Sequence, residues 1–175
     1  MRSAVFMARI VVRPRGALDA AAAGAKNMHM HISDPRTDAI ADLVREGAVH
    51  RAVYTDPALF ALEQERIFGR AWLYVGHESE VPAPGDWIRT RLGTAEVILA
   101  RTEDGALALL HNRCAHRGAG VVACDRGHAR HFRCPYHAWT YRLDGRLVGV
   151  PMASGYPTDF CARGDLGLAR VARVE

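Results

Sequence analysis

Two short groups of cysteine and histidine, separated by seventeen residues, constrain this sequence more than any other feature. The first has Cys114 and His116 with one residue between them, and the second has Cys134 and His137 with two residues between them. Each group therefore offers one thiolate and one imidazole to a metal. We interpret the two groups as the tips of two loops that approach each other and hold a small inorganic group between them.

The mixed composition of each group distinguishes between kinds of metal site. Zinc ligands usually come in pairs of one kind, either two cysteines or two histidines a few residues apart. In a [2Fe–2S] cluster, Cys114 and Cys134 would bind one iron, and His116 and His137 would bind the other through neutral imidazole nitrogens. Two imidazoles in place of two thiolates raise the reduction potential to about −150 to +300 mV. A zinc site and four unrelated core residues are the alternatives.

Closely spaced apolar segments predict the fold. Strands are expected over residues 71–76, 87–92, 95–100, 106–110, 138–143 and 146–150. The dipeptides Asp104-Gly105 and Asp144-Gly145 are hairpin signals, because aspartate–glycine pairs favour two-residue turns. Short strands with few helices predict a mostly β protein, an antiparallel sandwich or small barrel.

Two short helices are expected ahead of these strands. In both, an aspartate stands before a proline, as is typical of an N-cap followed by the first helical residue. Asp34 would begin the first helix and Gly47 would end it, whereas Asp56 and Gly69 would bound the second. We therefore expect a helical segment over residues 31–55 and a second domain over residues 56–175.

Residues 1–30 have five cations and one acid, whereas residues 31–175 have eighteen of each. We expect the basic segment to be a disordered leader or to precede the true start at Met28 or Met30, with an organelle transit peptide as the alternative. The remainder is neutral, so a nucleic-acid partner is not expected.

The apolar segments and the cysteines of the sequence indicate where in the cell the protein is located. No apolar run reaches the roughly 18 residues of a membrane span, so no membrane association is expected. The segment from Met1 to Lys26 lacks the apolar region of a secretory signal, and two of the four cysteines fall in metal-ligand spacing. A reducing cytoplasm fits these features. We interpret the other two cysteines, Cys124 and Cys161, as structural thiols.

From Asp56 to Glu175 the sequence closely resembles the N-terminal Rieske part of the alpha (large) subunit of aromatic-ring-hydroxylating dioxygenases. The resemblance rests on five stretches, which are residues 65–68, 72–77, 81–86, 112–118 and 134–139. It implies a Rieske-type antiparallel β sandwich whose two hairpin loops bind a [2Fe–2S] cluster. Cys114, His116, Cys134 and His137 match the cluster ligands of the family.

The positions around the ligands refine the resemblance. Trp139 matches the aromatic residue that flanks the second loop, whereas Ala138 stands where the family usually has glycine. High-potential respiratory Rieske proteins have a disulfide between the loops, but the corresponding residues here are Ala119 and Tyr136. The resemblance therefore implies a low-potential cluster.

The resemblance also implies a function. In the family, a reductase or ferredoxin passes electrons to the cluster, and the cluster passes them to a mononuclear Fe(II) in a C-terminal domain that hydroxylates the aromatic ring with O₂. We expect that domain to be absent from this chain, so that the chain alone transfers electrons. Oxygenase alpha and beta subunits are the other expected partners. The alternative is a stand-alone Rieske ferredoxin, although the helix after Asp56 is typical of the oxygenases.

One further group of residues has the types that bind metals. Asp125, His128 and His131 form a D-x-x-H-x-x-H pattern that is shorter than the family's iron-binding motif. Since it lies between the two predicted cluster loops, we expect it to be an exposed connection.

Overall fold

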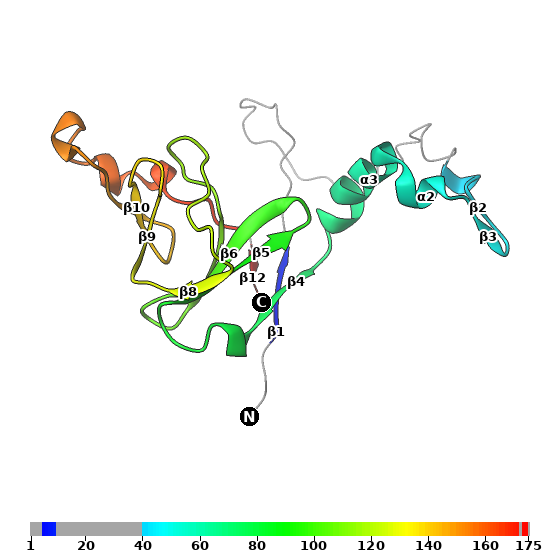
Figure 1. Ribbon diagram of the computed structural model, residues 1–175, viewed down its shortest axis with the longest axis horizontal. Coiled ribbons are helices and arrows are strands. Elements are labelled where there is room, and N and C mark those ends of the chain that lie inside the picture. The colour runs from blue at the N-terminus through cyan, green and yellow to red at the C-terminus, as the bar shows by residue number, and fades with distance from the viewer. Residues whose placement is uncertain (1–4, 10–39, 172, 175) are drawn as a thin grey trace, which may run out of the picture. The chain divides into compact units, whose positions relative to one another are not determined.

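The fold is given by a computed structural model that describes residues 5–9, 40–171 and 173–174 (Figure 1). The chain divides into two compact units, one comprising Met1–Val11 with Phe68–Glu175 and the other Val12–Ile67. The strands are β1 (Val5–Arg9), β2 (Val44–Arg45), β3 (Ala48–Val49), β4 (Leu73–His77), β5 (Asp86–Leu92), β6 (Ala95–Arg101), β7 (Leu107–His111), β8 (Arg126–His128), β9 (His131–Arg133), β10 (Thr140–Arg142), β11 (Leu147–Gly149) and β12 (Arg173–Val174). The α-helices are α2 (Ala52–Thr55) and α3 (Pro57–Glu63).

The larger unit consists of three antiparallel sheets. The strand orders are β7-β6-β5-β8, β12-β1-β4 and β11-β10-β9. Figure 1 shows the long strands β5 and β6 at the centre of this unit, with β9 and β10 to one side and β1 with β4 to the other. The predicted class, a mostly β protein of antiparallel sheets, is confirmed.

Strand β6 is buried on both of its faces. Val97, Ile98, Leu99 and Ala100 are all completely buried. Because side chains alternate along a strand, Val97 and Leu99 join an apolar cluster with β1 and β4, whereas Ile98 and Ala100 join the cluster that includes the predicted ligand loops. The continuous apolar run in the sequence therefore corresponds to a strand that packs on one side against the cluster of the predicted ligand loops.

Two predicted hairpins are confirmed. Gly105 lies in the turn that joins β6 to β7, with φ +81°, and Gly145 lies in the turn that joins β10 to β11, with φ +92°. Positive φ is accessible to glycine without a steric cost. The β10–β11 hairpin begins directly after the second ligand group, so its turn helps to fix the position of that loop.

In the smaller unit, one predicted helix is confirmed and the other is partly wrong. The Asp56 carboxylate accepts a hydrogen bond from the Ala58 amide at 2.7 Å, with proline in the first turn of α3, as expected of an N-cap. The first predicted helix falls largely on residues that the structure does not describe. Its end is wrong, since β2 and β3 pair around Gly47, whose φ is +73°. Gly47 therefore makes a hairpin turn instead of ending a helix.

The expectation of a disordered leader is wrong for residues 5–9. These residues form β1, which pairs with β4 on one side and β12 on the other. Phe6 and Ala8 are buried, so the strand contributes to the hydrophobic core. The basic residues on either side of it in the sequence gave no indication of a buried strand. The rest of the predicted leader lies outside the described residues. In the part of the chain that is described, no helix has the length and apolar character to cross a bilayer.

Candidate metal centre

The first ligand loop is closed by hydrogen bonds at its cysteine. The Cys114 amide donates to the Ala119 carbonyl at 2.8 Å, and the Gly118 amide donates to the Cys114 carbonyl at 2.9 Å. Gly118 has φ +75°, in the left-handed region that glycine occupies without a steric penalty. The loop therefore turns back tightly on itself, and His116 lies within the turn between Cys114 and Gly118.

The second loop repeats the same backbone pattern twenty residues later. The Cys134 amide donates to the Trp139 carbonyl at 2.8 Å, and the Ala138 amide donates to the Cys134 carbonyl at 2.9 Å. Ala138 has φ +55°, so it occupies the conformation of Gly118 without being glycine. The two cysteines thus occupy equivalent positions in their loops, whereas the histidines differ by one position, His116 coming two residues after its cysteine and His137 three.

The two predicted histidine ligands lie next to each other. Their ring centroids are 4.7 Å apart, and the planes are inclined at 66°. The His116 ring also stacks on Trp139, with centroids 4.8 Å apart and planes 5° from parallel. His116 Nδ1 is buried and has no hydrogen-bond partner in the described part of the chain. A buried imidazole nitrogen without a partner is costly, and a metal ion in contact with it would remove that cost.

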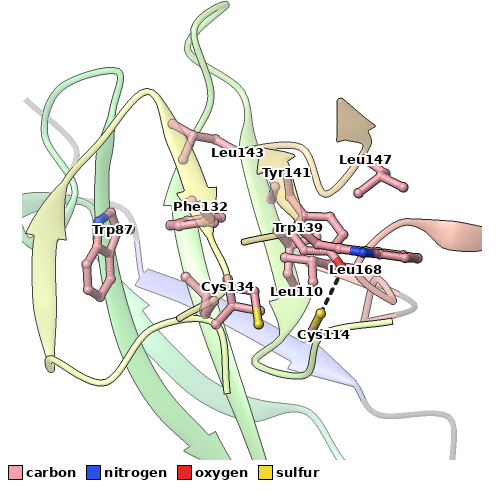
Figure 2. Close-up of a cluster of buried hydrophobic side chains, with 14 residues drawn as sticks. Trp87, Leu110, Cys114, Phe132, Cys134, Trp139, Tyr141, Leu143, Leu147 and Leu168 are labelled. Atoms are coloured by element: carbon pink, nitrogen blue, oxygen red, sulfur yellow. Dashed lines mark hydrogen bonds between the residues drawn. The ribbon is translucent and has the colours of Figure 1, made fainter. Parts of the chain in front are cut away.

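The two predicted cysteine ligands are buried free thiols in one apolar cluster. Figure 2 shows the sulfur atoms of Cys114 and Cys134 on the same side of that cluster, beside Trp139 and Tyr141. The structure therefore brings together the four side chains that the spacing singled out, from two loops of matching backbone shape.

Tyr141 is a further residue of the centre that the sequence pattern did not indicate. Its hydroxyl lies 3.1 Å from Cys114 Sγ and accepts a hydrogen bond from the Ala115 amide at 3.2 Å. Burial raises the pKa of the Tyr141 phenol far above its usual value, and the contact with Cys114 acts in the same direction. Since the amide occupies the oxygen as an acceptor, the phenolic proton is free to point at the sulfur.

Asn112 holds the first loop against the segment that follows it. Its Oδ1 accepts hydrogen bonds from the amides of Val121 and Val122 at 2.8 and 3.0 Å, and its Nδ2 donates to the Val122 carbonyl at 2.9 Å. Asn112 is buried, and these bonds satisfy the polar groups of its side chain inside the protein. Asn112 belongs to a family-like stretch, but that resemblance gave no reason for an asparagine.

The electrostatic environment favours a neutral imidazole at His137. Desolvation lowers the pKa of His137, and the nearby His116 ring and Arg117 guanidinium lower it further. Histidine binds metals in its neutral form. The centre therefore holds this side chain in the form that a metal requires.

The donor groups do not converge as they would around a single ion. Across the described ranges, no three His, Cys, Asp or Glu side chains are grouped as ligands of one metal ion. A structural zinc site would need four donors around one atom. Two cysteines and two histidines are the donor set of a Rieske [2Fe–2S] cluster, in which the two histidines bind one of the two irons.

The D-x-x-H-x-x-H pattern is not brought together either. Asp125 pairs with Arg89 at 2.8 Å, and His128 pairs with Asp86 at 2.8 Å. His131 lies exposed on β9. Of the two remaining cysteines, Cys161 packs against the apolar cluster of the ligand loops, whereas Cys124 is exposed, so the expectation of a structural thiol fails for Cys124.

Comparison with known proteins gives one matching family and many relatives. Residues 71–160 match the Rieske [2Fe-2S] domain. The chain is 38% identical over 143 residues to the N,N-dimethyl phenylurea N-demethylase subunit alpha of Sphingobium sp. (strain YBL2), a match that covers 81% of this chain and 31% of that protein. It is 42% identical over 116 residues to the biphenyl dioxygenase subunit alpha of Metapseudomonas furukawaii, covering 65% of this chain and 25% of that one.

Solved structures agree with these relatives. A naphthalene 1,2-dioxygenase with indole bound in its active site superposes with a TM-score of 0.67 at 38% identity, covering 71% of this chain and 28% of that chain. A quaternary ammonium Rieske monooxygenase in complex with gamma-butyrobetaine superposes with a TM-score of 0.61 at 30% identity. The chain thus spans about a third or less of the length of these relatives.

Proposed function

Because this chain belongs to the Rieske [2Fe-2S] domain family, we propose that Cys114, His116, Cys134 and His137 hold a [2Fe–2S] cluster. The buried, unpartnered Nδ1 of His116 is the observation that carries this assignment. Supporting it are the two buried thiols in one apolar cluster and the adjacent imidazole rings. When bound, such a cluster supplies a site that accepts and releases one electron at a time.

The side chains around the ligands would hold the centre and keep water from it. Trp139 covers one face of the His116 ring and is itself buried, so solvent does not reach that face. The Tyr141 hydroxyl lies 3.1 Å from Cys114 Sγ. To a deprotonated, metal-bound sulfur it would donate a hydrogen bond and so stabilise the negative charge there. The matched backbone hydrogen bonds at the two cysteines would hold the tips of both loops in the same shape.

We propose that the electrons serve an oxygenase. The chain would be the Rieske part of an aromatic-ring-hydroxylating dioxygenase alpha subunit, which receives electrons from a reductase or ferredoxin and passes them to a mononuclear non-haem iron. The names of the relatives support this assignment, since they are alpha subunits of dioxygenases and of an N-demethylase. We place the protein in the cytoplasm, where its four free cysteines would stay reduced.

Substitution of single ligands tests the cluster assignment. Cys134→Ser and His137→Ala should each abolish binding of iron and sulfide, because each removes one of four donors. Cys124→Ser is the matched control, since Cys124 is exposed and outside both loops, and it should retain the wild-type content. Iron and acid-labile sulfide are measured on protein purified without oxygen. Loss of both in Cys124→Ser, with retention in Cys134→Ser, would overturn the assignment.

A further inference from the structure

The segment between β11 and β12 packs against the apolar cluster of the ligand loops. It contains three short 3₁₀ turns, which are Ala153–Gly155, Phe160–Ala162 and Gly164–Leu166. Three of its partly buried side chains contact that cluster, and they are Phe160, Cys161 and Leu166. The segment therefore covers part of the cluster, although none of the four proposed ligands belongs to it.

Phe160 makes a defined ring contact within this packing. Its ring centroid lies 5.7 Å from that of Trp139, and the two ring planes are inclined at 90°. An edge-to-face arrangement at this separation is one of the geometries that aromatic pairs prefer. Trp139 is only 5% exposed, and Figure 2 shows its indole among the other side chains of the cluster. A residue outside both ligand loops thus contacts a buried ring of the second loop.

Trp139 in turn contacts a proposed ligand. Its ring is stacked on His116, with centroids 4.8 Å apart and planes 5° from parallel. The stacked imidazole cannot tilt toward Trp139 unless the indole moves first. The three rings of Phe160, Trp139 and His116 therefore form a row in which the outer ring limits the movement of the inner ones.

The outer end of this row is itself held in place. The Tyr156 ring lies 4.4 Å from the Phe160 ring, and the planes are inclined at 36°. The Tyr156 amide donates to the Ala153 carbonyl and the Phe160 amide to the Pro157 carbonyl, each at 3.0 Å. Both aromatic residues are half-buried. The backbone turns and the Tyr156 ring together keep Phe160 against Trp139.

We propose that Phe160 is a positioning residue of the centre, which holds Trp139 against His116 and so keeps that face of the imidazole dry. The proposal rests on the proposed function and deepens it, because it concerns the environment of the same centre. Phe160 acts through Trp139, whereas Trp139 contacts the proposed ligand directly.

Water beside a ligand changes the reduction potential of a centre of this kind. Solvent access and local polarity are among the factors that set the potential of an iron–sulfur cluster. Reduction adds a negative charge, and water stabilises added charge better than an apolar side chain does. Loss of the Phe160 ring would free the indole and admit water, so the reduction potential should rise.

The test is a redox titration of the cluster-loaded full chain. The variants are Phe160→Ala, which removes the ring, and Phe160→Tyr, which retains it. Leu166→Ala is the control, since Leu166 packs against the same apolar cluster but has no ring to contact Trp139. The titration is repeated on Trp139→Leu with and without Phe160→Ala, because a residue that acts through Trp139 has little further effect once the indole is absent.

We expect Phe160→Ala to shift the equilibrium toward the reduced state by about three- to tenfold, which is a rise of about 30–60 mV for one electron. Phe160→Tyr, Leu166→Ala and the second substitution in Trp139→Leu should each shift it by less than about twofold. An unchanged potential in Phe160→Ala, an equal shift in Leu166→Ala, or a full shift in the Trp139→Leu background would overturn the role of Phe160.

Two further outcomes are distinguishable from these. If Phe160→Ala does not bind the cluster, Phe160→Leu is measured in its place and judged by the same criteria, since leucine lacks the ring but keeps most of the apolar volume. Failure of the wild-type chain to bind iron and sulfide would instead refute the proposed function itself.

Discussion

The two ligand loops differ at one position in a way that stability measurements can test. Gly118 and Ala138 both follow their cysteine by four residues, and both have positive φ, +75° and +55°. A left-handed conformation costs a residue with a Cβ about 1–2 kcal/mol, whereas glycine loses about 0.5–1 kcal/mol more conformational entropy on folding. The difference predicts that Ala138→Gly stabilises the protein by about 1 kcal/mol. For a chain of this length, that corresponds to an increase in Tm of about 2–4 °C.

The reverse substitution in the other loop should have the opposite effect. Gly118→Ala introduces the same left-handed cost, and its Cβ would meet Arg113 Nε at 3.1 Å, so the flexible Arg113 side chain must move. We expect a loss of about 1–2 kcal/mol. Gly155→Ala is the control, because Gly155 does not have positive φ and a Cβ there meets nothing within 4 Å.

Guanidinium unfolding of the cluster-loaded proteins, followed by circular dichroism, measures these differences. The reasoning requires Ala138→Gly to raise the free energy of unfolding, Gly118→Ala to lower it, and Gly155→Ala to change it by less than about 0.5 kcal/mol or to raise it slightly. If Ala138→Gly destabilised the protein, or Gly118→Ala matched the Gly155→Ala control, the equivalence of the two loops would be refuted.

Three further predictions concern groups near the loops and strands. Tyr141→Phe removes the hydroxyl that would donate to a metal-bound Cys114 sulfur, and that hydrogen bond is stronger when the centre carries an extra electron. Loss of about 1–2 kcal/mol of hydrogen-bond energy from the reduced state predicts a reduction potential about 40–90 mV lower, measured by redox titration. An unchanged potential would show that the hydroxyl does not donate to the sulfur. Asn112→Ala leaves the buried Val121 amide and the part-buried Val122 amide without their acceptor. It should lower the free energy of unfolding by about 2–4 kcal/mol in denaturant titrations, and a loss under about 1 kcal/mol would contradict the assigned network. The pKa of Asp104 is lowered by hydrogen bonds from the Thr102 hydroxyl and the Ala106 amide. Its contribution to the free energy of unfolding is therefore present above the unfolded pKa of about 3.9 and is lost as pH falls through the lowered pKa. Asp104→Asn should weaken the dependence of stability on pH below about pH 4, and an unaltered pH profile would be evidence against this.

Sequence patterns predicted the parts of this structure that are determined by neighbouring residues. The turns at Gly105 and Gly145 and the Asp56 cap depend on local backbone preferences, and all three are confirmed. The ligand groups are also local, since each pair is held within one loop. Resemblance to a family then explained why Ala138 is unusual, and the structure supplies the physical reason, its positive φ.

The parts that were missed depend on contacts between distant residues. Strand β1 pairs with β4 more than sixty residues away. Its Phe6 is buried, but the basic residues around it in the sequence gave no signal of a buried strand. Strands β8 and β9 are only three residues each, too short for a periodic pattern. The Tyr141 contact with Cys114 spans 27 residues and depends on how β10 lies against the first loop. Local sequence signals do not contain that information.

Electron paramagnetic resonance of the anaerobically purified, dithionite-reduced chain tests the central claim most directly, with iron and sulfide measured on the same sample. The account predicts a [2Fe–2S] signal with the low average g value of mixed cysteine and histidine ligation, present in wild type and Cys124→Ser and absent in Cys134→Ser. A sample that contains zinc, lacks iron and sulfide and gives no signal would contradict it.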